Sequence, residues 1–177
     1  MKPESLTAVE RKILVNQFLR LEKLDPDGAE YYAESRDIIE HGYTIFYEEV
    51  LQSIYDEMPI EECRYVFDVL DMHRALRNSY DKLADKGGIP EDDIRFRGFD
   101  GNNETKRYAF AEHLKKTGKW TETLSGGLNS HSITTMHRYP KMLEKYNRIT
   151  EKHKEKDSMA SEWWMLSAAE IKEVTGH

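Results

Sequence analysis

The segment from Pro59 to Ala84 constrains the fold most, because its pattern is that of one long helix with apolar residues over most of its surface. At about 100° per residue, the apolar positions cover well over half of the circumference. These positions are Tyr65, Val66, Phe67, Val69, Leu70, Met72, Leu76, Tyr80 and Leu83. Pro59 suits the first turn, and Glu61 and Glu62 lie where the helix dipole favours acidic side chains. We therefore expect a central helix with the other helices wrapped around it.

Shorter helical patterns lie on both sides of this segment. Thr7 and Glu10 match a capping box at the start of a first helix, and Gly42 is placed as the left-handed cap of a second. Before the central helix over about 59–84, we predict a helix opened by Thr7 and stopped by 24–28, a second over about 29–41, and a third from Thr44 that buries Phe46, Val50, Leu51 and Ile54. After it we predict a fifth helix from Asn102 or Asn103 to Gly118 and a sixth that carries Met136 to Ile149. A short last helix is capped by 167–170. The apolar residues of 94–99 are too few to indicate a strand and predict a packed loop. The fold class is thus all-α, a single domain of six or seven helices over residues 1–177.

Composition limits the kinds of function. The chain has 177 residues, a length typical of one domain, and 11% aromatic residues, which disordered chains lack. Its formal net charge of −7 disfavours a large nucleic-acid interface, since neutralising phosphates needs clustered Lys and Arg. With one cysteine, Cys63, we expect neither an internal disulfide nor a cysteine zinc site. No long apolar run is present, so we expect a cytoplasmic protein without membrane contact.

The segment Asp100–Glu104 combines glycine, asparagine and acidic residues just before a helical pattern. It begins like a calcium-binding loop, but Thr105 stands where a glycine is needed and Ala111 where a bidentate glutamate is needed. A structural role is therefore favoured, in which Asp100 or an asparagine caps the fifth helix. The seven histidines form no metal-binding motif such as His-Glu-x-x-His. We expect neither a metal nor a cofactor.

Arg107 and His113 have a spacing similar to the Arg-x5-His motif of helical RNA-cleaving domains of the HEPN type. In those domains the arginine orients a phosphate and the histidine does acid–base work. Tyr108 departs from that motif, which usually has a polar residue at this position. A surface arginine and a surface histidine on one helix are the favoured interpretation, and a catalytic pair is the alternative.

Charged residues interrupt the apolar arc of the central helix. By the same angular count Arg74, Arg77 and Asp81 project into this arc, and Arg77 and Asp81 are one turn apart, so they can pair. Charges on a buried stripe must be paired, or must face an interface or a cavity. The favoured interpretation is a structural ion-pair network in desolvated surroundings. The alternatives are an arginine-lined pocket for an anion and a polar patch within a dimer interface.

If the chain has a binding site, we expect it where two polar segments meet near Arg74 and Arg77. One segment is Asp100–Glu104, and the other is Gly126–His131, within a long polar loop predicted over 121–135. The candidate ligand-binding residues are Arg74, Arg77, Asp81, Asp100, Asn102, Asn103, Glu104, Asn129 and His131.

Several of these segments together resemble the bacterial YfbU family of small helical proteins. The matching stretches are Ile13–Phe18 with Leu24–Pro26, Ile38–Tyr43, Cys63–Tyr80, Gly98–Tyr108, Met142–Tyr146 and Leu166–Ser167, in the expected order. The resemblance implies an all-helical single domain, cytoplasmic in bacteria. It supplies no catalytic residues.

Two functional hypotheses from different classes follow. The first is a non-enzymatic interaction or regulatory protein, a homo-oligomer with a possible protein partner, which uses apolar surface such as Trp163 and Trp164. The second is a small enzyme that acts on a phosphate-bearing substrate such as RNA, through Arg107 and His113 or the arginines of the central helix. The first is favoured, because no nucleophile–base pair, metal motif or phosphate-binding loop stands out.

Overall fold

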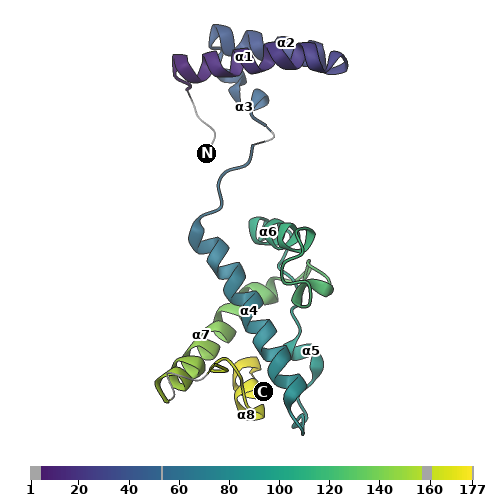
Figure 1. The fold of residues 1–177 in the computed structure, drawn as a ribbon, viewed down its shortest axis with the longest axis vertical. Helices are drawn as coiled ribbons and strands as arrows, with labels where there is room; N and C mark the ends of the chain where they lie inside the picture. The colour runs from purple at the N-terminus through teal and green to yellow at the C-terminus, as the bar shows by residue number, and fades with distance from the viewer. Residues whose placement is uncertain (1–4, 53, 157–160, 177) are drawn as a thin grey trace. The chain divides into compact units, whose positions relative to one another are not determined.

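The computed structural model describes residues 5–52, 54–156 and 161–176, and every regular element among them is helical (Figure 1). The prediction of an all-α fold is therefore confirmed. Six of these helices have at least eight residues, and α3 and α5 are single turns. The helices are α1 (Ala8–Leu24), α2 (Ala29–His41), α3 (Tyr47–Val50), α4 (Ile60–Lys82), α5 (Glu91–Ile94), α6 (Thr105–Lys116), α7 (Ile133–Lys156) and α8 (Ala168–Thr175).

The chain forms two compact units, Met1–Glu57 and Met58–His177. In the first unit α1 and α2 lie along each other (Figure 1). Within its described residues, 5–52 and 54–57, the fully buried apolar side chains are few: Val15, Ile39 and Tyr47. That the two units act as one domain stays a prediction from the sequence.

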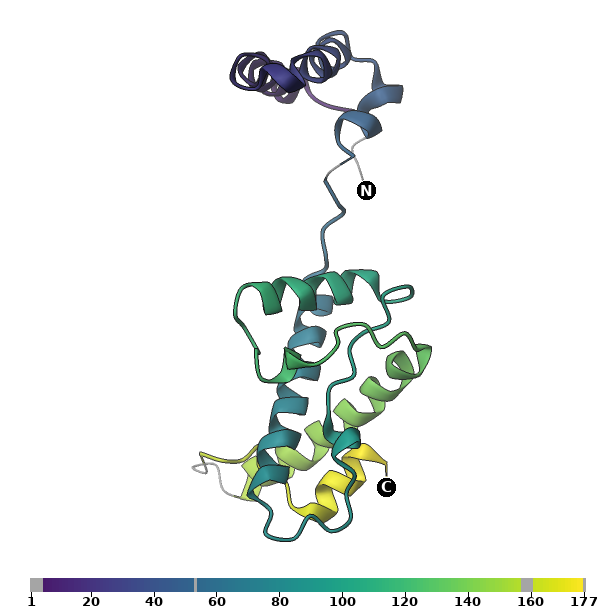
Figure 2. The same ribbon diagram turned by 90° about the vertical axis from the view of Figure 1, so that its right-hand side faces the viewer.

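In the second unit α4 is the central element. The helices α5, α6, α7 and α8 all pack against it (Figure 2). Val66, Leu70, Met72 and Leu76 on α4 have no exposure to solvent. Full burial of an apolar side chain of this size contributes about 1.5–3 kcal/mol, so this helix carries the core as predicted. It ends at Lys82, slightly before the predicted end, because Leu83 takes an extended conformation.

Three helix ends follow local capping signals and confirm the predictions. At α1 the Glu10 N–H donates to the Thr7 hydroxyl at 3.2 Å, while the Thr7 N–H donates to the Glu10 carboxylate at 2.8 Å. The same reciprocal bonds join Ser167 and Glu170 at the start of α8. Gly42 ends α2 in the left-handed conformation, with φ of 73°. Each cap depends on residues no more than four positions apart, which the sequence displays directly.

The predicted third helix is wrong in length and in burial. The chain forms a 3-10 turn at Thr44–Phe46 and then the single α-helical turn α3, and Phe46 and Ile54 are exposed instead of buried. A longer helix would need a core to cover these side chains. Among its described residues the first unit fully buries the three apolar side chains named above, and neither Phe46 nor Ile54 packs against them.

Two further helix starts are wrong. The helix α6 begins at Thr105, so neither Asn102 nor Asn103 is its N-cap. The reason is a turn built before the helix, in which the Asn102 N–H donates to the Asp100 carboxylate at 3.0 Å. The helix α7 begins at 133, within the predicted loop, and the Ser132 hydroxyl accepts the N–H of the second helical residue at 3.2 Å.

The segments before α6 and before α7 are joined through their backbones. The Phe99 N–H donates to the Leu128 carbonyl and the Ser130 N–H donates to the Phe99 carbonyl, both at 2.9 Å. Gly98 has a φ of 91°, and a Cβ at this position would lie 2.3 Å from the Leu128 carbonyl oxygen. This close approach therefore needs a glycine.

Gly98→Ala is expected to lower the free energy of unfolding by about 3 kcal/mol or more, since it adds an overlap with backbone to the strain of a positive φ. Gly118→Ala is the matched control, because Gly118 has a φ of 75° but no atom within 4 Å of an added Cβ. The control should cost the strain alone, about 1 kcal/mol. Urea unfolding measures both, and equal losses would contradict the close approach at Gly98.

Candidate functional site

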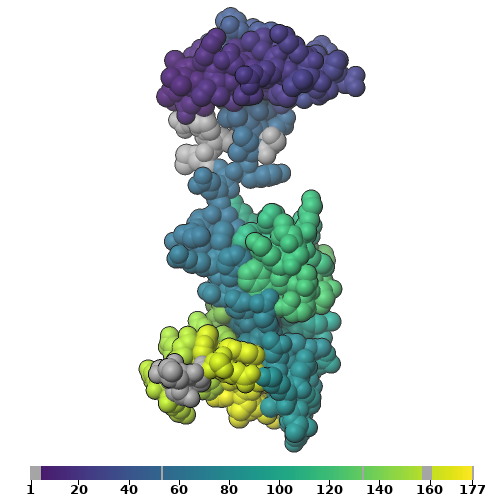
Figure 3. Space-filling view, in the orientation of Figure 1, coloured from purple at the N-terminus to yellow at the C-terminus, as the bar shows by residue number. Residues whose placement is uncertain are grey.

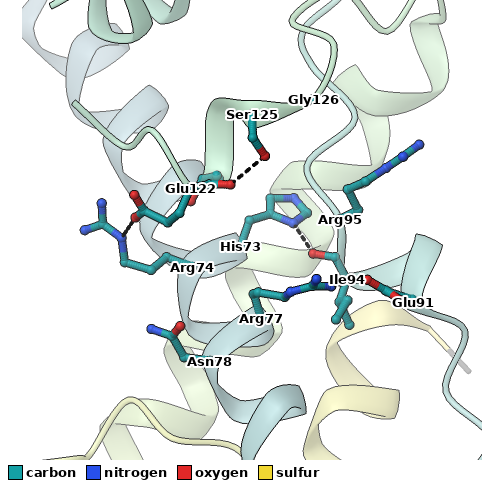
Figure 4. Close-up of a pocket in the computed structure, with 11 residues that line it drawn as sticks. His73, Arg74, Arg77, Asn78, Glu91, Ile94, Arg95, Glu122, Ser125 and Gly126 are labelled. Atoms are coloured by element: carbon teal, nitrogen blue, oxygen red, sulfur yellow. Dashed lines mark hydrogen bonds and ion pairs between the residues drawn. The ribbon is translucent and has the colours of Figure 1, made fainter. Parts of the chain in front are cut away.

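A pocket of about 260 Å³ opens beside α4 in the second unit. One side comes from α4, another from α5 and the residue after it, and a third from the loop that follows α6 (Figure 4). The lining residues are His73, Arg74, Arg77, Asn78, Glu91, Ile94, Arg95, Glu122, Thr123, Ser125 and Gly126.

His73 is the most buried polar residue of this pocket, with 2% of its surface exposed. Its Nδ1 lies 2.9 Å from the carbonyl oxygen of Ile94 (Figure 4). Because a carbonyl oxygen only accepts, Nδ1 carries the proton and Nε2 is left as an acceptor. Burial lowers the pKa of His73 to about 4, so the ring is neutral at pH 7. Nε2 has no hydrogen-bond partner among the described residues.

The arginines of α4 are paired with carboxylates at the edge of the pocket. Arg74 bonds Glu122, which reaches across from the loop, and Arg77 bonds Glu91 (Figure 4). Arg77 also lies 3.4 Å from Asp81, as predicted for residues one turn apart. The predicted desolvation of this pair is wrong, because the Arg77 and Asp81 side chains are 49% and 58% exposed. The pair is a surface ion pair.

The angular count fails at Arg77 and Asp81 because the cover of α4 changes along its length. Leu70 and Asp81 lie within about 20° of each other around the helix, yet Leu70 is buried and Asp81 is exposed. The same side of α4 is thus packed in its earlier turns and faces the pocket in its later turns. A helical wheel cannot predict this change in burial, because the burial of each turn depends on which segments of the chain pack against that turn.

The two polar segments predicted to meet do meet. The Asn129 side-chain oxygen accepts from the Gly101 N–H at 3.1 Å and from the His131 N–H at 3.0 Å. The residues of Asp100–Glu104 do not line the arginine pocket, to which the loop contributes 122–126 instead. Asn129 therefore contacts Asp100–Glu104, whereas Arg74 and Arg77 lie beside 122–126, an earlier part of the same loop.

Within this junction the polar groups are bonded to one another. The Asp100 carboxylate accepts from the Asn103 side-chain amide at 2.6 Å and from the Asn102 N–H at 3.0 Å. These two bonds hold the pKa of Asp100 below its ordinary value. The Asp100 N–H in turn donates to the Glu104 carboxylate at 3.1 Å. Ligand binding by Asp100, Asn102, Asn103 and Glu104 stays a prediction.

Arg107 ties the start of α6 to α4. Its guanidinium donates to both carboxylate oxygens of Glu62, at 2.6 and 3.1 Å, and to Glu104 at 2.9 Å. It also lies 4.2 Å from the centre of the Tyr65 ring. The bonds from Arg107 lower the pKa of Glu62. His113 is exposed in the last turn of α6. The guanidinium fork of Arg107 is thus occupied by carboxylates of the chain itself.

A second candidate surface lies in the first unit. Every large apolar side chain that is exposed in the described part of the chain lies between Val9 and Ile60, and all but Ile60 belong to this unit. The members within the unit, named here the N-terminal apolar surface, are Val9, Ile13, Leu19, Leu21, Leu24, Tyr31, Tyr43, Ile45, Phe46, Ile54 and Tyr55. Its first five members belong to α1, whose side chains form one face of this unit in the space-filling view (Figure 3).

The tryptophans proposed as apolar anchors are less exposed than this set. Trp163 and Trp164 are both half-buried. The Lys154 ammonium lies 3.7 Å from the Trp163 ring centre, and the Lys82 ammonium lies 5.8 Å from that of Trp164. Each ring therefore has a cation of the same unit over one face.

Two classes of site find no support among the described residues. Within 5–52, 54–156 and 161–176 no group of three or more His, Cys, Asp or Glu side chains is placed to hold a metal ion. No helix in this part of the chain combines the length and apolar character that crossing a membrane requires.

Of the residues that line the pocket, the candidate ligand-binding residues include only Arg74 and Arg77, and those missed include His73, Arg95 and Thr123. A signal existed for His73, which sits between apolar positions of the central helix. None existed for Thr123, because its position depends on the short 3-10 turn Thr123–Ser125, whose Leu124 is buried in the core.

Arg107→Ala is expected to lower the free energy of unfolding by about 3 kcal/mol, because it leaves a buried carboxylate without an opposite charge beside it. That carboxylate is Glu104, whose side chain is 2% exposed. Arg77→Ala is the matched control and should cost about 1 kcal/mol or less, as for surface ion pairs. Urea unfolding tests the contrast, and a loss at Arg77 as large as that at Arg107 would contradict it.

Acid is expected to destabilise the protein through His73. The folded protein protonates this ring only near pH 4, whereas the ordinary pKa is 6.5. Between these values the unfolded chain holds more protons, so the free energy of unfolding falls as the pH falls from about 6.5 to 4, by up to roughly 3 kcal/mol. The comparison of wild type with His73→Gln by urea unfolding at several pH values isolates this component from the carboxylates. Parallel profiles would show that His73 is not held neutral by the fold.

Comparison with known protein families gives a match to a described domain. The family model of the YfbU domain matches residues 4–176. The match runs through both compact units.

Proposed function

This chain belongs to the YfbU family, and we propose that it acts as a non-enzymatic interaction protein that self-associates through the N-terminal apolar surface. The observation that supports the proposal is the gathering of all exposed large apolar side chains of the described residues between Val9 and Ile60. Monomeric soluble proteins rarely expose extended apolar patches, which commonly mark interaction sites. We place this interaction in the cytoplasm, in keeping with a chain whose one cysteine has no internal disulfide partner.

The helix α1 is apolar on two sides, which supports a partner beyond α2. Val15 is buried within the first unit, whereas Ile13 is 55% exposed. Residues two positions apart lie about 160° apart around a helix, so these side chains point to nearly opposite sides. The α1–α2 contact covers one apolar side of α1, and no described residue of this unit covers Ile13 on the other side fully.

The small core of the first unit supports the same conclusion. Among the described residues, three fully buried apolar side chains form its core, against more than twenty in the second unit. Units of this size are marginally stable when their core is small, and oligomerisation is one way in which they bury further apolar surface. A second copy of the chain presents the same surface and completes the core through a two-fold, self-complementary contact.

The enzyme alternative that uses Arg107 and His113 gains no supporting contact among the described residues. A phosphate-binding arginine needs a guanidinium that is free to reach its substrate. The Arg107 guanidinium is held by Glu62 and Glu104, and His113 lies at the other end of α6. Catalysis by Arg107 and His113 stays a prediction from their spacing.

Ile13→Asp is expected to convert a dimer into a monomer. The wild-type protein should sediment at twice the 20.8 kDa of one chain, and the variant at the mass of one chain. The introduced charge would have to be desolvated without a partner in the contact, which costs several kcal/mol. Sedimentation equilibrium measures both masses.

The control variant is Ala109→Asp, which adds the same charge at an exposed position of α6. It should leave the dimer intact. A wild-type protein that sediments as a monomer would overturn the proposal, as would an Ile13→Asp variant that stays dimeric. A monomer would mean that another part of the chain or a different protein covers the N-terminal apolar surface.

A further inference from the structure

Two polar atoms without partners lie in residues that line one pocket. Among the described residues, three buried side-chain polar atoms have no hydrogen-bond partner: Tyr65 Oη, His73 Nε2 and Thr123 Oγ1. His73 and Thr123 both line the pocket beside α4. A buried polar group without a partner costs about 1–3 kcal/mol, and buried polar groups in native proteins nearly always have one. Two such atoms at one pocket point to a bound molecule that supplies the missing bonds.

A hydroxyl group has the chemistry to bond both atoms. Nε2 of His73 accepts only, because Nδ1 donates to the Ile94 carbonyl. The Thr123 hydroxyl both donates and accepts. A hydroxyl group on the ligand can donate a hydrogen bond to His73 Nε2. It can either donate to the Thr123 hydroxyl or accept from it.

The charged residues around the pocket favour an anion. Three arginines and two glutamates line it, and His73 is neutral at pH 7. Arg74 and Arg77 leave α4 one turn apart on the same side of the pocket as His73 (Figure 4). Their carboxylate partners Glu122 and Glu91 are 54% and 63% exposed. Such exposed pairs contribute only about 0–1 kcal/mol, so an incoming oxyanion displaces them at small cost and gains bidentate bonds.

The volume limits the ligand to a small molecule. A pocket of about 260 Å³ lies just below the range of about 300–1,000 Å³ that is usual for drug-sized ligands. It corresponds to roughly nine water molecules at about 30 Å³ each. A nucleic acid or a long peptide does not fit within it.

We propose that the pocket beside α4 binds a small hydroxylated organic anion, whose phosphate or carboxylate lies on Arg77 and whose hydroxyl groups bond Thr123 and His73. This binding site goes beyond the proposed self-association. It is formed entirely within the unit Met58–His177, whereas the N-terminal apolar surface lies within the unit Met1–Glu57.

Isothermal titration calorimetry of the full chain tests the proposal with four probes. Ribose 5-phosphate and gluconate carry hydroxyl groups with a phosphate or a carboxylate, and the two distinguish these anions. Inorganic phosphate lacks the carbon-bound hydroxyl groups, and ribose lacks the anion. At least one of the two hydroxylated anions should bind saturably with a Kd of about 1 mM or tighter. It should bind at least about tenfold more tightly than ribose and inorganic phosphate, since each absent group removes at least one bond. No saturable binding of either anion, or equal binding of ribose or inorganic phosphate, would overturn the proposal.

Variants locate the binding. Arg77→Ala should weaken it at least about tenfold, because a charge-assisted bond is lost. Thr123→Val should weaken it about fivefold while leaving the unfolding midpoint unchanged or higher, since it removes a hydroxyl that has no partner. Arg148→Ala is the control, because Arg148 is 51% exposed, pairs with Glu173 and lies outside the pocket.

Each remaining outcome decides the question. Unaltered affinity in Arg77→Ala, or an equal loss in Arg148→Ala, would show that the anion binds elsewhere. A lower unfolding midpoint in Thr123→Val would show that its hydroxyl already has a partner in the folded chain. Ile13→Asp should retain the binding, so a failure of self-association is distinguishable from a failure of the pocket.

Discussion

The burial of α4 is the constraint on which the second unit depends. Leu70, Met72 and Leu76 have no exposure, and every other helix of the unit packs against this one. A close-packed core fixes side chains in single arrangements, so residues that leave α4 on its open side start from a rigid support. His73, Arg74 and Arg77 are such residues. The same helix thus anchors the core and positions the pocket residues of its later turns.

The first unit has no comparable element. Among its described residues Val15, Ile39 and Tyr47 are fully buried and five more apolar side chains are partly buried against them, while several others stay exposed. The two units therefore differ in which kind of group lacks a partner. The second unit buries its apolar surface and leaves polar atoms without partners at one pocket. The first leaves apolar side chains exposed. Exposed apolar surface indicates a protein partner, whereas polar atoms without hydrogen bonds at a pocket indicate a bound ligand.

The sequence predicts well those features that depend on residues close together along the chain. The capping boxes at Thr7 and Ser167 and the identity of the central helix depend on short-range patterns, and all three are confirmed. It predicts less well what distant segments decide. Arg77 lies on an apolar arc by angular count, yet it is exposed, since no periodic pattern states which turns of a helix are covered. The pocket depends on Thr123, which a loop brings to α4 from about fifty residues away along the chain.

Electrostatics separates the two proposed interactions. Residues 1–57 contain six Lys or Arg and thirteen Asp or Glu, so the whole net charge of −7 falls on the unit with the apolar surface. Two copies that meet through this unit repel each other, and added salt screens that repulsion while apolar contact is unaffected or strengthened. An anion on Arg77 is held by attraction between opposite charges, which salt weakens. A higher ionic strength should therefore strengthen self-association and weaken anion binding. Residues 58–177 are balanced, with twenty residues of each sign, so the attraction for an anion comes from the local placement of arginines around the pocket and not from the charge of the unit.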